Sequence, residues 1–179
     1  MTSTYYSPDL EQLRNQQVRY APRDKKLEQI NRAERLLAEI DQNRDYSYEY
    51  LCYRITDYRP TSTSPITVNG QEVIHDLRLF VEDVSDSANI PAKDAGEPVH
   101  TVEELSKLFN VSTKTISRWR DQGLVSRRFV FDGRKRVGFL RSSVERFVAQ
   151  NRNRVQRGQN FSQMTEEERL EIVQRARRL

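Results

Sequence analysis

The chain has 179 residues, with 30 Lys and Arg against 26 Asp and Glu, and a formal net charge of +4. This length allows one or two modest domains and excludes a large multidomain enzyme. Hydrophobic residues make up 36% of the chain, below the ~45–50% that is usual for globular proteins. The sequence therefore predicts small hydrophobic cores rather than one large core.

The cysteine count and the hydropathy of the chain indicate the cellular compartment in which the protein is expected. The single cysteine, Cys52, excludes a disulfide framework and a zinc site built from several thiolates, and it favours a reducing compartment. No stretch approaches the ~18 consecutive apolar residues of a membrane span, and the N-terminus lacks a basic start followed by an apolar core. We therefore expect a cytoplasmic protein without a membrane partner.

Positive charge is concentrated in one part of the chain. Residues 101–158 hold 14 Lys and Arg against 5 Asp and Glu, a net charge of +9, whereas residues 1–100 hold 12 against 17, a net charge of −5. Such a basic block suits a partner with many phosphates, because each phosphate contact releases condensed counterions. The alternative is an ordinary Arg-rich soluble surface.

The first 60 residues predict three helices. Ser7 is a suitable cap, and Pro8 a suitable first residue, for a helix that runs to about Val18. Apolar residues at three-to-four spacing predict a second helix over residues 22–40. The tyrosine-rich residues 46–58 predict a third helix, with a β-strand as the alternative.

Four residues in or after this region bear on its interpretation. Cys52 has no second thiol nearby, so we interpret it as a small buried hydrophobe. Asn69 and Glu72 form a capping box for a fourth helix that ends near Val84. His75 lies off the apolar face of that helix, and no metal site is expected.

Residues 99–151 have the pattern of two short helices joined by a tight turn. Thr101 and Glu104 form a capping box for the first helix, and Asn110 is suited to the left-handed conformation that ends it. Ser112 then caps the second helix. This is the helix-turn-helix layout. The expected core residues of this segment are Leu105, Leu108, Ile116, Trp119, Val130, Phe139, Val144, Phe147 and Val148.

The second helix carries a polar face opposite its apolar residues. Trp119 could stack on a base, but its spacing from Ile116 favours the core. Lys114 and Arg118 can donate to guanine O6 and N7 or to phosphate in a DNA major groove, and the alternative is solvated surface. The candidate DNA-binding residues of this face are Thr113, Lys114, Ser117 and Arg118.

A basic β-hairpin follows the two helices. Runs 127–131 and 136–140 are β-prone, and Asp132-Gly133 between them is a hairpin signal. Its cations favour contact with the phosphate backbone or minor groove, and the alternative is that they prevent edge pairing. The candidate DNA-binding residues of this hairpin are Arg127, Arg128, Arg134, Lys135 and Arg136. Ser142 or Ser143 is expected to cap a last helix.

The order TVEELSKLFNVSTKTISRWRDQGL, basic hairpin, then RSSVERFV resembles the winged helix-turn-helix of the mercury-resistance-regulator and excisionase type. The resemblance covers about 50 residues. It implies that the second helix reads the major groove and that the hairpin, or wing, contacts the backbone. It assigns these roles to Lys114, Ser117, Arg118 and residues 134–136.

The segments LEQLRNQQVRYAPRDKKLEQINRAERLLAEID, YSYEYLCYRITDYRP and HDLRLFVEDVS, placed before this module, are similar to the N-terminal part of some bacterial sigma-70 family RNA polymerase sigma factors. This resemblance implies a role in transcription initiation or its regulation, with the RNA polymerase core as a further partner. The promoter-reading and polymerase-binding signature regions of that family are not evident in these residues.

These patterns predict a mainly α protein in four parts. We expect a helical N-terminal region over residues 1–84, a flexible linker over 85–98, the winged helix-turn-helix over 99–151, and a basic linker with a C-terminal amphipathic helix over 152–179. Thr165 and Glu168 form the capping box of that last helix. The chain stops without a helix stop signal, which favours a piece of a longer protein over a natural end.

No enzyme signature is present. The sequence has no glycine-rich phosphate loop and no nucleophile paired with a histidine base, so we expect no catalytic residues, no cofactor and no metal. The predicted function is double-stranded DNA binding in bacterial transcription. The alternative is a protein-interaction adaptor that docks on RNA polymerase or another partner through its amphipathic helices. The sequence predicts neither the DNA target nor the oligomeric state.

Overall fold

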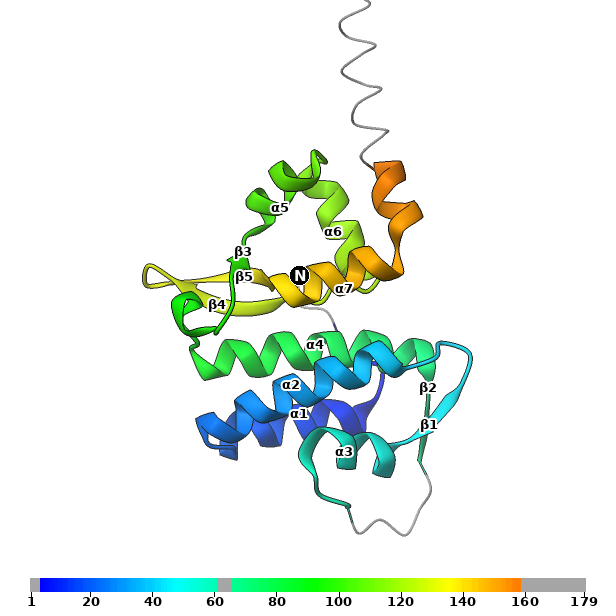
Figure 1. Cartoon of the computed structure of the whole chain (residues 1–179). Coiled ribbons are helices and arrows are strands. Elements are labelled where there is room, and N and C mark those ends of the chain that lie inside the picture. The colour runs from blue at the N-terminus through cyan, green and yellow to red at the C-terminus, as the bar shows by residue number, and fades with distance from the viewer. Residues whose placement is uncertain (1–3, 61–65, 159–179) are drawn as a thin grey trace, which may run out of the picture.

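The computed structural model describes residues 4–60 and 66–158. The fold is mainly α, with small antiparallel β elements, as the sequence predicts. Figure 1 shows a lower group of helices formed by the first half of the chain and an upper group formed by the second half, with the long helix α4 between them. One hydrophobic cluster fills the lower group and also includes Val125, Phe129 and Leu140 of the second half of the chain, and a second cluster lies within the upper group.

The lower group begins with two helices. Helix α1 (Pro8–Tyr20) is capped by Ser7, whose hydroxyl accepts a hydrogen bond from the Leu10 N–H. Helix α2 (Arg23–Glu39) buries the apolar stripe that the sequence predicts, with Ile30 and Leu36 fully buried. The predicted bounds of both helices are confirmed to within two residues.

The tyrosine-rich segment contains both of the structures that its composition allowed. Strand β1 (Asp45–Ser47) pairs antiparallel with β2 (Thr67–Asn69), and helix α3 (Tyr48–Thr56) follows β1 directly. Cys52 lies in α3 as a buried free thiol, which confirms its interpretation as a small buried hydrophobe.

Helix α4 (Gly70–Ala88) is capped by Asn69, whose side chain accepts from the Gln71 N–H. The prediction that it ends near Val84 is wrong by a turn, because Ser85 and Ala88 are buried under the second half of the chain. Helix α4 contacts both groups, since its apolar face packs on α1 and α2 while its last turns pack against β4.

Residues 85–98 do not form the flexible linker that the sequence suggests. The Ser85 hydroxyl accepts from the Arg128 N–H at 2.9 Å, and the Ile90 carbonyl accepts from the Val130 N–H at 2.8 Å. A 3-10 turn, η1 (Ala92–Asp94), follows. The small residues of this segment allow a strand to approach the end of α4 closely. The segment is therefore packed against that strand, although its low hydrophobicity is typical of a flexible linker.

The upper group contains the two short helices of the prediction. After strand β3 (Val99–His100), helix α5 (Val102–Phe109) is capped by Thr101 and ends at Asn110, which adopts the left-handed conformation with φ 54°. Helix α6 (Thr113–Asp121) is capped by Ser112, whose hydroxyl accepts from the Thr115 N–H at 3.1 Å. These caps fix a short turn between the helices, as predicted.

A three-stranded antiparallel sheet in the order β3-β5-β4 completes the wing. Strand β4 (Arg127–Phe131) and strand β5 (Arg134–Leu140) are joined by Asp132 and Gly133 alone. Both have positive φ, 48° and 81°, as a type I′ hairpin turn requires. Strand β5 therefore begins at Arg134, two residues earlier than predicted.

Helix α7 (Arg141–Gln150) starts differently from the prediction. Its N-cap is Leu140, whose side chain cannot accept a capping hydrogen bond. Ser142 and Ser143 lie inside the first turn, so neither is the cap. Glu97 takes that role instead, because its carboxylate accepts from the Ser142 N–H at 2.7 Å and from the Ser142 hydroxyl at 3.0 Å.

The second hydrophobic cluster confirms most of the predicted core of the upper group. Leu108 is an exception, since it is 62% exposed while Phe109 packs against the cluster. Val130 is only partly buried, and its neighbour Phe129 packs instead with the cluster of the lower group. The buried residues of the second cluster are Leu105, Val111, Ile116, Trp119, Leu124, Phe139, Val144, Phe147 and Val155.

Residues 152–158 are helical, where the sequence suggests a basic linker. The predicted amphipathic helix around Thr165 and Glu168 lies outside the described residues. Within the described part of the chain, no helix is both long and apolar enough to cross a membrane, and no group of three or more His, Cys, Asp or Glu side chains could hold a metal ion.

Candidate nucleic-acid interface

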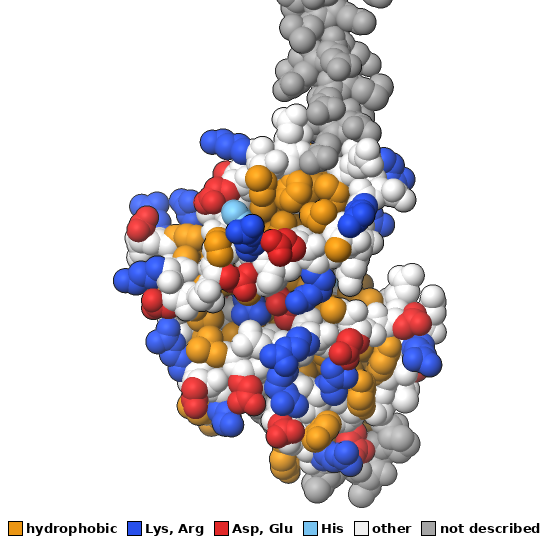
Figure 2. Space-filling model, viewed as in Figure 1, with side chains coloured by type: hydrophobic (Ala, Val, Ile, Leu, Met, Phe, Trp, Pro, Cys, Tyr) orange, Lys and Arg blue, Asp and Glu red, His pale blue; other side chains and the backbone are white. Residues whose placement is uncertain are grey.

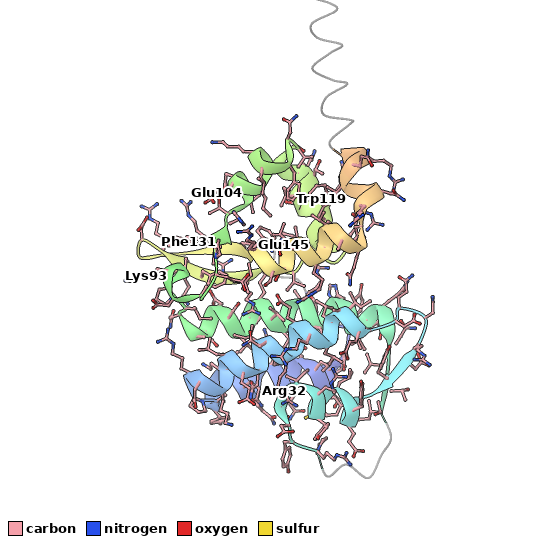
Figure 3. All side chains as sticks on the ribbon, viewed as in Figure 1. Arg32, Lys93, Glu104, Trp119, Phe131 and Glu145 are labelled. Carbon is pink, nitrogen blue, oxygen red and sulfur yellow. The ribbon has the colours of Figure 1, made fainter. Side chains whose placement is uncertain are left out.

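Helix α6 is anchored by two apolar side chains. Ile116 and Trp119 are buried, and the Trp119 ring contacts the rings of Phe109 at 5.6 Å and Phe147 at 5.7 Å between centroids. Figure 3 shows Trp119 between α6 and the helical turn that follows α7. This burial confirms the core role of Trp119 and excludes base stacking by its ring in this conformation.

The opposite face of α6 is exposed. It carries four of the predicted DNA-binding residues, namely Thr113, Lys114, Ser117 and Arg118. Among the described residues, neither Lys114 nor Arg118 forms an ion pair. Their charges are therefore available to an external anion.

The C-terminal end of α6 is fixed to α4. Asp121 accepts from Arg78 Nη2 at 3.2 Å, and Arg120 donates to Glu82 Oε1 at 2.9 Å. Burial lowers the pKa of Arg78 from its ordinary value, and the charge of Asp121 acts against this shift. These contacts use the end of α6 that lies away from its N-terminal turns. The N-terminal turns, which helix-turn-helix proteins place against base edges, stay exposed.

Arg127, one of the predicted DNA-binding residues of the wing, is a buried structural residue. Its side chain is 9% exposed, and Nη2 donates to Asn31 Oδ1 and to Glu34 Oε2, both at 3.1 Å. Glu34 is buried as well and also accepts from the Ser143 hydroxyl at 2.9 Å. Because its guanidinium faces α2 rather than solvent, the prediction that Arg127 contacts DNA is wrong.

Asp86 of α4 partly neutralises two further cations of the wing. Its carboxylate accepts from Arg128 Nε at 3.1 Å and lies 3.6 Å from Lys135 Nζ, which also donates to the Asp86 carbonyl at 2.9 Å. Both cationic side chains remain partly exposed, at 36% and 41%. A role for Arg128 and Lys135 on DNA stays a prediction, in which phosphate would compete with Asp86.

Arg134 and Arg136 are further exposed cations of the wing. Both lie on β5, and neither forms an ion pair with another described residue. Strand β4 is covered by the end of α4 and by Ile90, whereas no other strand of the described residues pairs with β5 along Arg134 to Arg136 on the side away from β4. The wing therefore presents β5 and its tip outward.

An apolar groove marks a different face of the upper group. It has a volume of about 710 Å³ and lies between α5 and α7, with Leu108, Phe109, Val144 and Val148 among its lining residues. Figure 2 shows apolar side chains gathered on the upper group, and His100 also lines the groove. An apolar surface is unsuited to phosphate, so this groove is not part of the cationic face.

Sequence reasoning missed the contribution of residues 152–158. This helix carries Arg152, Arg154 and Arg157, and its Val155 is buried in the second cluster. The sequence signal that could have identified this helix is the contribution of its three arginines to the net charge of +9 over residues 101–158. Their place beside α6 depends on tertiary packing, which local sequence patterns do not reveal.

Comparison with known proteins agrees with this geometry. Residues 101–152 match a family described as a helix-turn-helix domain. Neither a curated protein nor a solved structure matches the chain. The matched residues cover α5, α6, the wing and α7, and so include the exposed cationic residues of α6 and of the wing. This part of the chain is similar to helix-turn-helix domains, and the similarity supports DNA binding.

Proposed function

We propose that this protein binds double-stranded DNA through a winged helix-turn-helix, with the N-terminal turns of α6 in the major groove and the wing on the phosphate backbone. The observation that carries the proposal is the two-sided nature of α6. Ile116 and Trp119 anchor one side, while Lys114 and Arg118 are exposed and unpaired among the described residues on the other. Lys and Arg on such a face donate to guanine O6 and N7 and to phosphate.

The wing contributes through fewer cations than its sequence suggests. Arg134 and Arg136 are exposed and supply phosphate contacts directly, whereas Arg128 and Lys135 must exchange Asp86 for phosphate. Contacts of this kind fix the register of a protein on the duplex without reading its sequence. Specificity therefore depends on α6.

The biological setting of this proposal is bacterial transcription in the cytoplasm. The similarity of the N-terminal region to sigma-70 family factors supports a role in transcription initiation or its regulation, with the RNA polymerase core as a second partner. The winged arrangement supports kinship with mercury-resistance regulators and excisionases. The proposal assigns no catalytic residue, cofactor or metal.

The alternative function is a protein-interaction adaptor that docks on RNA polymerase or another partner through its amphipathic helices. Leu10, Ile30 and Leu77, on the apolar faces of α1, α2 and α4, are buried against one another in the lower group. These faces stabilise the fold and are not exposed to a partner.

A salt titration of duplex binding tests the proposal. Fluorescence anisotropy with the full chain is expected to show an affinity that falls steeply with salt, with a slope set by the number of phosphates contacted. Arg118→Ala is expected to weaken binding and change sequence preference, and Arg134→Ala to weaken binding uniformly. Duplex affinity that is independent of salt, or unchanged in both variants, would contradict the proposal.

A further inference from the structure

The helix over residues 152–158 is seated against α6. Its Val155 is 5% exposed and belongs to the same hydrophobic cluster as Ile116 and Trp119. A Cβ atom on Gly158 would lie 3.2 Å from Trp119 Cζ2 and 3.5 Å from Thr115 Cγ2. The helix therefore packs on α6 itself, although nearly all of it lies beyond the residues that match the helix-turn-helix family.

The cations of this helix have only local neutral partners among the described residues. Arg154 Nη1 lies 3.5 Å from Asn151 Oδ1, and Arg157 Nε donates to the Asn153 carbonyl at 3.3 Å. Neither guanidinium forms an ion pair with a described carboxylate. Their positive charges are not neutralised by this part of the protein.

Helical spacing places Arg154 and Arg157 on the flank that adjoins α6. Residues three and four apart are neighbours on a helix surface. Arg154 is four residues before Gly158, and it is three residues before Arg157. Arg154 is therefore a surface neighbour of both residues, and the two cations lie on the Gly158 side of the helix. Arg152 lies on the other flank, where it lines the apolar groove.

The same spacing rule identifies the flank of α6 that this helix touches. Thr115, which faces Gly158, is three residues before Arg118 and is therefore its neighbour on the α6 surface. Arg118 is exposed. The cations of residues 152–158 thus continue the exposed cationic face of α6 along one side.

We propose that the helix over residues 152–158 is a third DNA-contacting element, in which Arg154 and Arg157 bind phosphates of the strand that borders the groove entered by α6. This inference rests on the proposed function. A helix lying in the major groove has the sugar-phosphate backbone on its flanks, so a cation held beside that helix meets phosphate rather than a base edge. Val155 and Gly158 hold the short helix in position for that contact.

The test compares Arg154→Ala/Arg157→Ala with the wild-type full chain, using anisotropy over a salt series on two duplexes of unrelated sequence. Loss of two phosphate contacts is expected to weaken binding about tenfold at low salt and to reduce the salt slope by about 2. The loss is expected to be equal on both duplexes, because phosphate contacts carry no sequence information. Arg23→Ala/Arg35→Ala, on exposed residues of α2, is the charge-matched control and is expected to keep the wild-type slope.

Two outcomes separate this inference from the function on which it rests. If the wild-type chain and the double variant have the same salt slope while Arg118→Ala binds weakly, the third element is disproved and DNA binding by α6 stands. If the wild-type chain does not bind duplex DNA, both proposals fail. Arg157→Glu provides an independent variant at an exposed site, and it is expected to weaken binding more than Arg157→Ala.

Discussion

Arg127 and Glu34 form a buried ion pair that joins the two halves of the chain. Arg127 Nη2 lies 3.1 Å from Glu34 Oε2, and the two side chains are 9% and 7% exposed. The residues are 93 positions apart in the sequence. Glu34 also binds Ser143 of α7, so one carboxylate of α2 holds both the wing and the last helix of the helix-turn-helix domain.

Removing one member of this pair is expected to destabilise the fold. Arg127→Ala leaves the Glu34 charge buried with only Ser143 at 2.9 Å and the more distant Arg146 Nη1 at 4.0 Å as described partners, and loss of one partner of a buried pair costs about 3–5 kcal/mol. Chemical denaturation measures this loss. If Arg127→Ala kept wild-type stability but reduced the salt slope of DNA binding by about 1, Arg127 would be a DNA contact and its structural assignment would be wrong.

Asp86 is expected to restrain DNA binding by the wing. Asp86→Asn removes a negative charge beside Arg128 and Lys135 and frees both cations for phosphate. We expect a duplex affinity several-fold higher than wild type and a steeper salt slope, by about 1–2. Anisotropy at several salt concentrations measures both.

The matched control for that variant is Asp45→Asn. Asp45 is exposed on β1, in the lower group, and its replacement changes the net charge equally. An equal gain in affinity from both variants would show that overall charge, and not the release of two particular cations, sets the effect.

Leu105 and Leu108 are three residues apart on α5, yet they are expected to respond differently to truncation. Leu105 is fully buried and Leu108 is 62% exposed. Leu105→Ala is expected to cost about 2–5 kcal/mol of unfolding free energy, and Leu108→Ala to change it by less than about 0.5 kcal/mol. Urea denaturation of both variants is the measurement, and equal losses would contradict the observed orientation of α5.

Asp76 is expected to give the stability of the protein a distinct pH dependence. Its carboxylate is fully buried and accepts from the N–H groups of Tyr6 and Ser7, both at 2.8 Å. Burial raises the pKa of Asp76 above its ordinary value, although those two hydrogen bonds and His75 act in the opposite direction. The native state therefore binds this proton more tightly than the unfolded chain does.

The sign of the effect follows from proton linkage. The contribution of Asp76 to the unfolding free energy is largest below the unfolded pKa of ~3.9 and falls as the pH rises through the higher native pKa. The stability of wild type relative to Asp76→Asn should fall over that interval. A relative stability that instead grew with pH would show that the native pKa of Asp76 is depressed.

Local signals in the sequence were sufficient to predict the helix-turn-helix. Thr101, Asn110 and Ser112 are cap residues whose chemistry acts within a few positions, and each adopts the predicted role. The Asp132-Gly133 turn is equally local, because its positive φ angles depend on those two residues alone. The exposed face of α6 followed from the spacing of Ile116 and Trp119.

Some features depend on packing between residues far apart in the sequence, and local sequence patterns could not predict them. Arg127 and Arg128 look alike in the sequence, but the former meets Glu34 at a separation of 93 residues and the latter meets Asp86 at a separation of 42. Ser85 looked like part of a linker because it is small and polar. It is fully buried, and its hydroxyl binds the backbone of β4. Which cations are neutralised, and where the chain packs, depends on partners that local patterns do not identify.

Selection of bound sites from random duplexes, at two salt concentrations, tests the central claim most directly. The wild-type chain is expected to enrich a defined motif at both concentrations, and Arg118→Ala to relax preference at one position at a cost of about 1–3 kcal/mol. Lys114 and Arg118 would then be reading bases from an exposed helix face. Enrichment of no motif by the wild-type chain at either salt concentration would contradict sequence reading by α6.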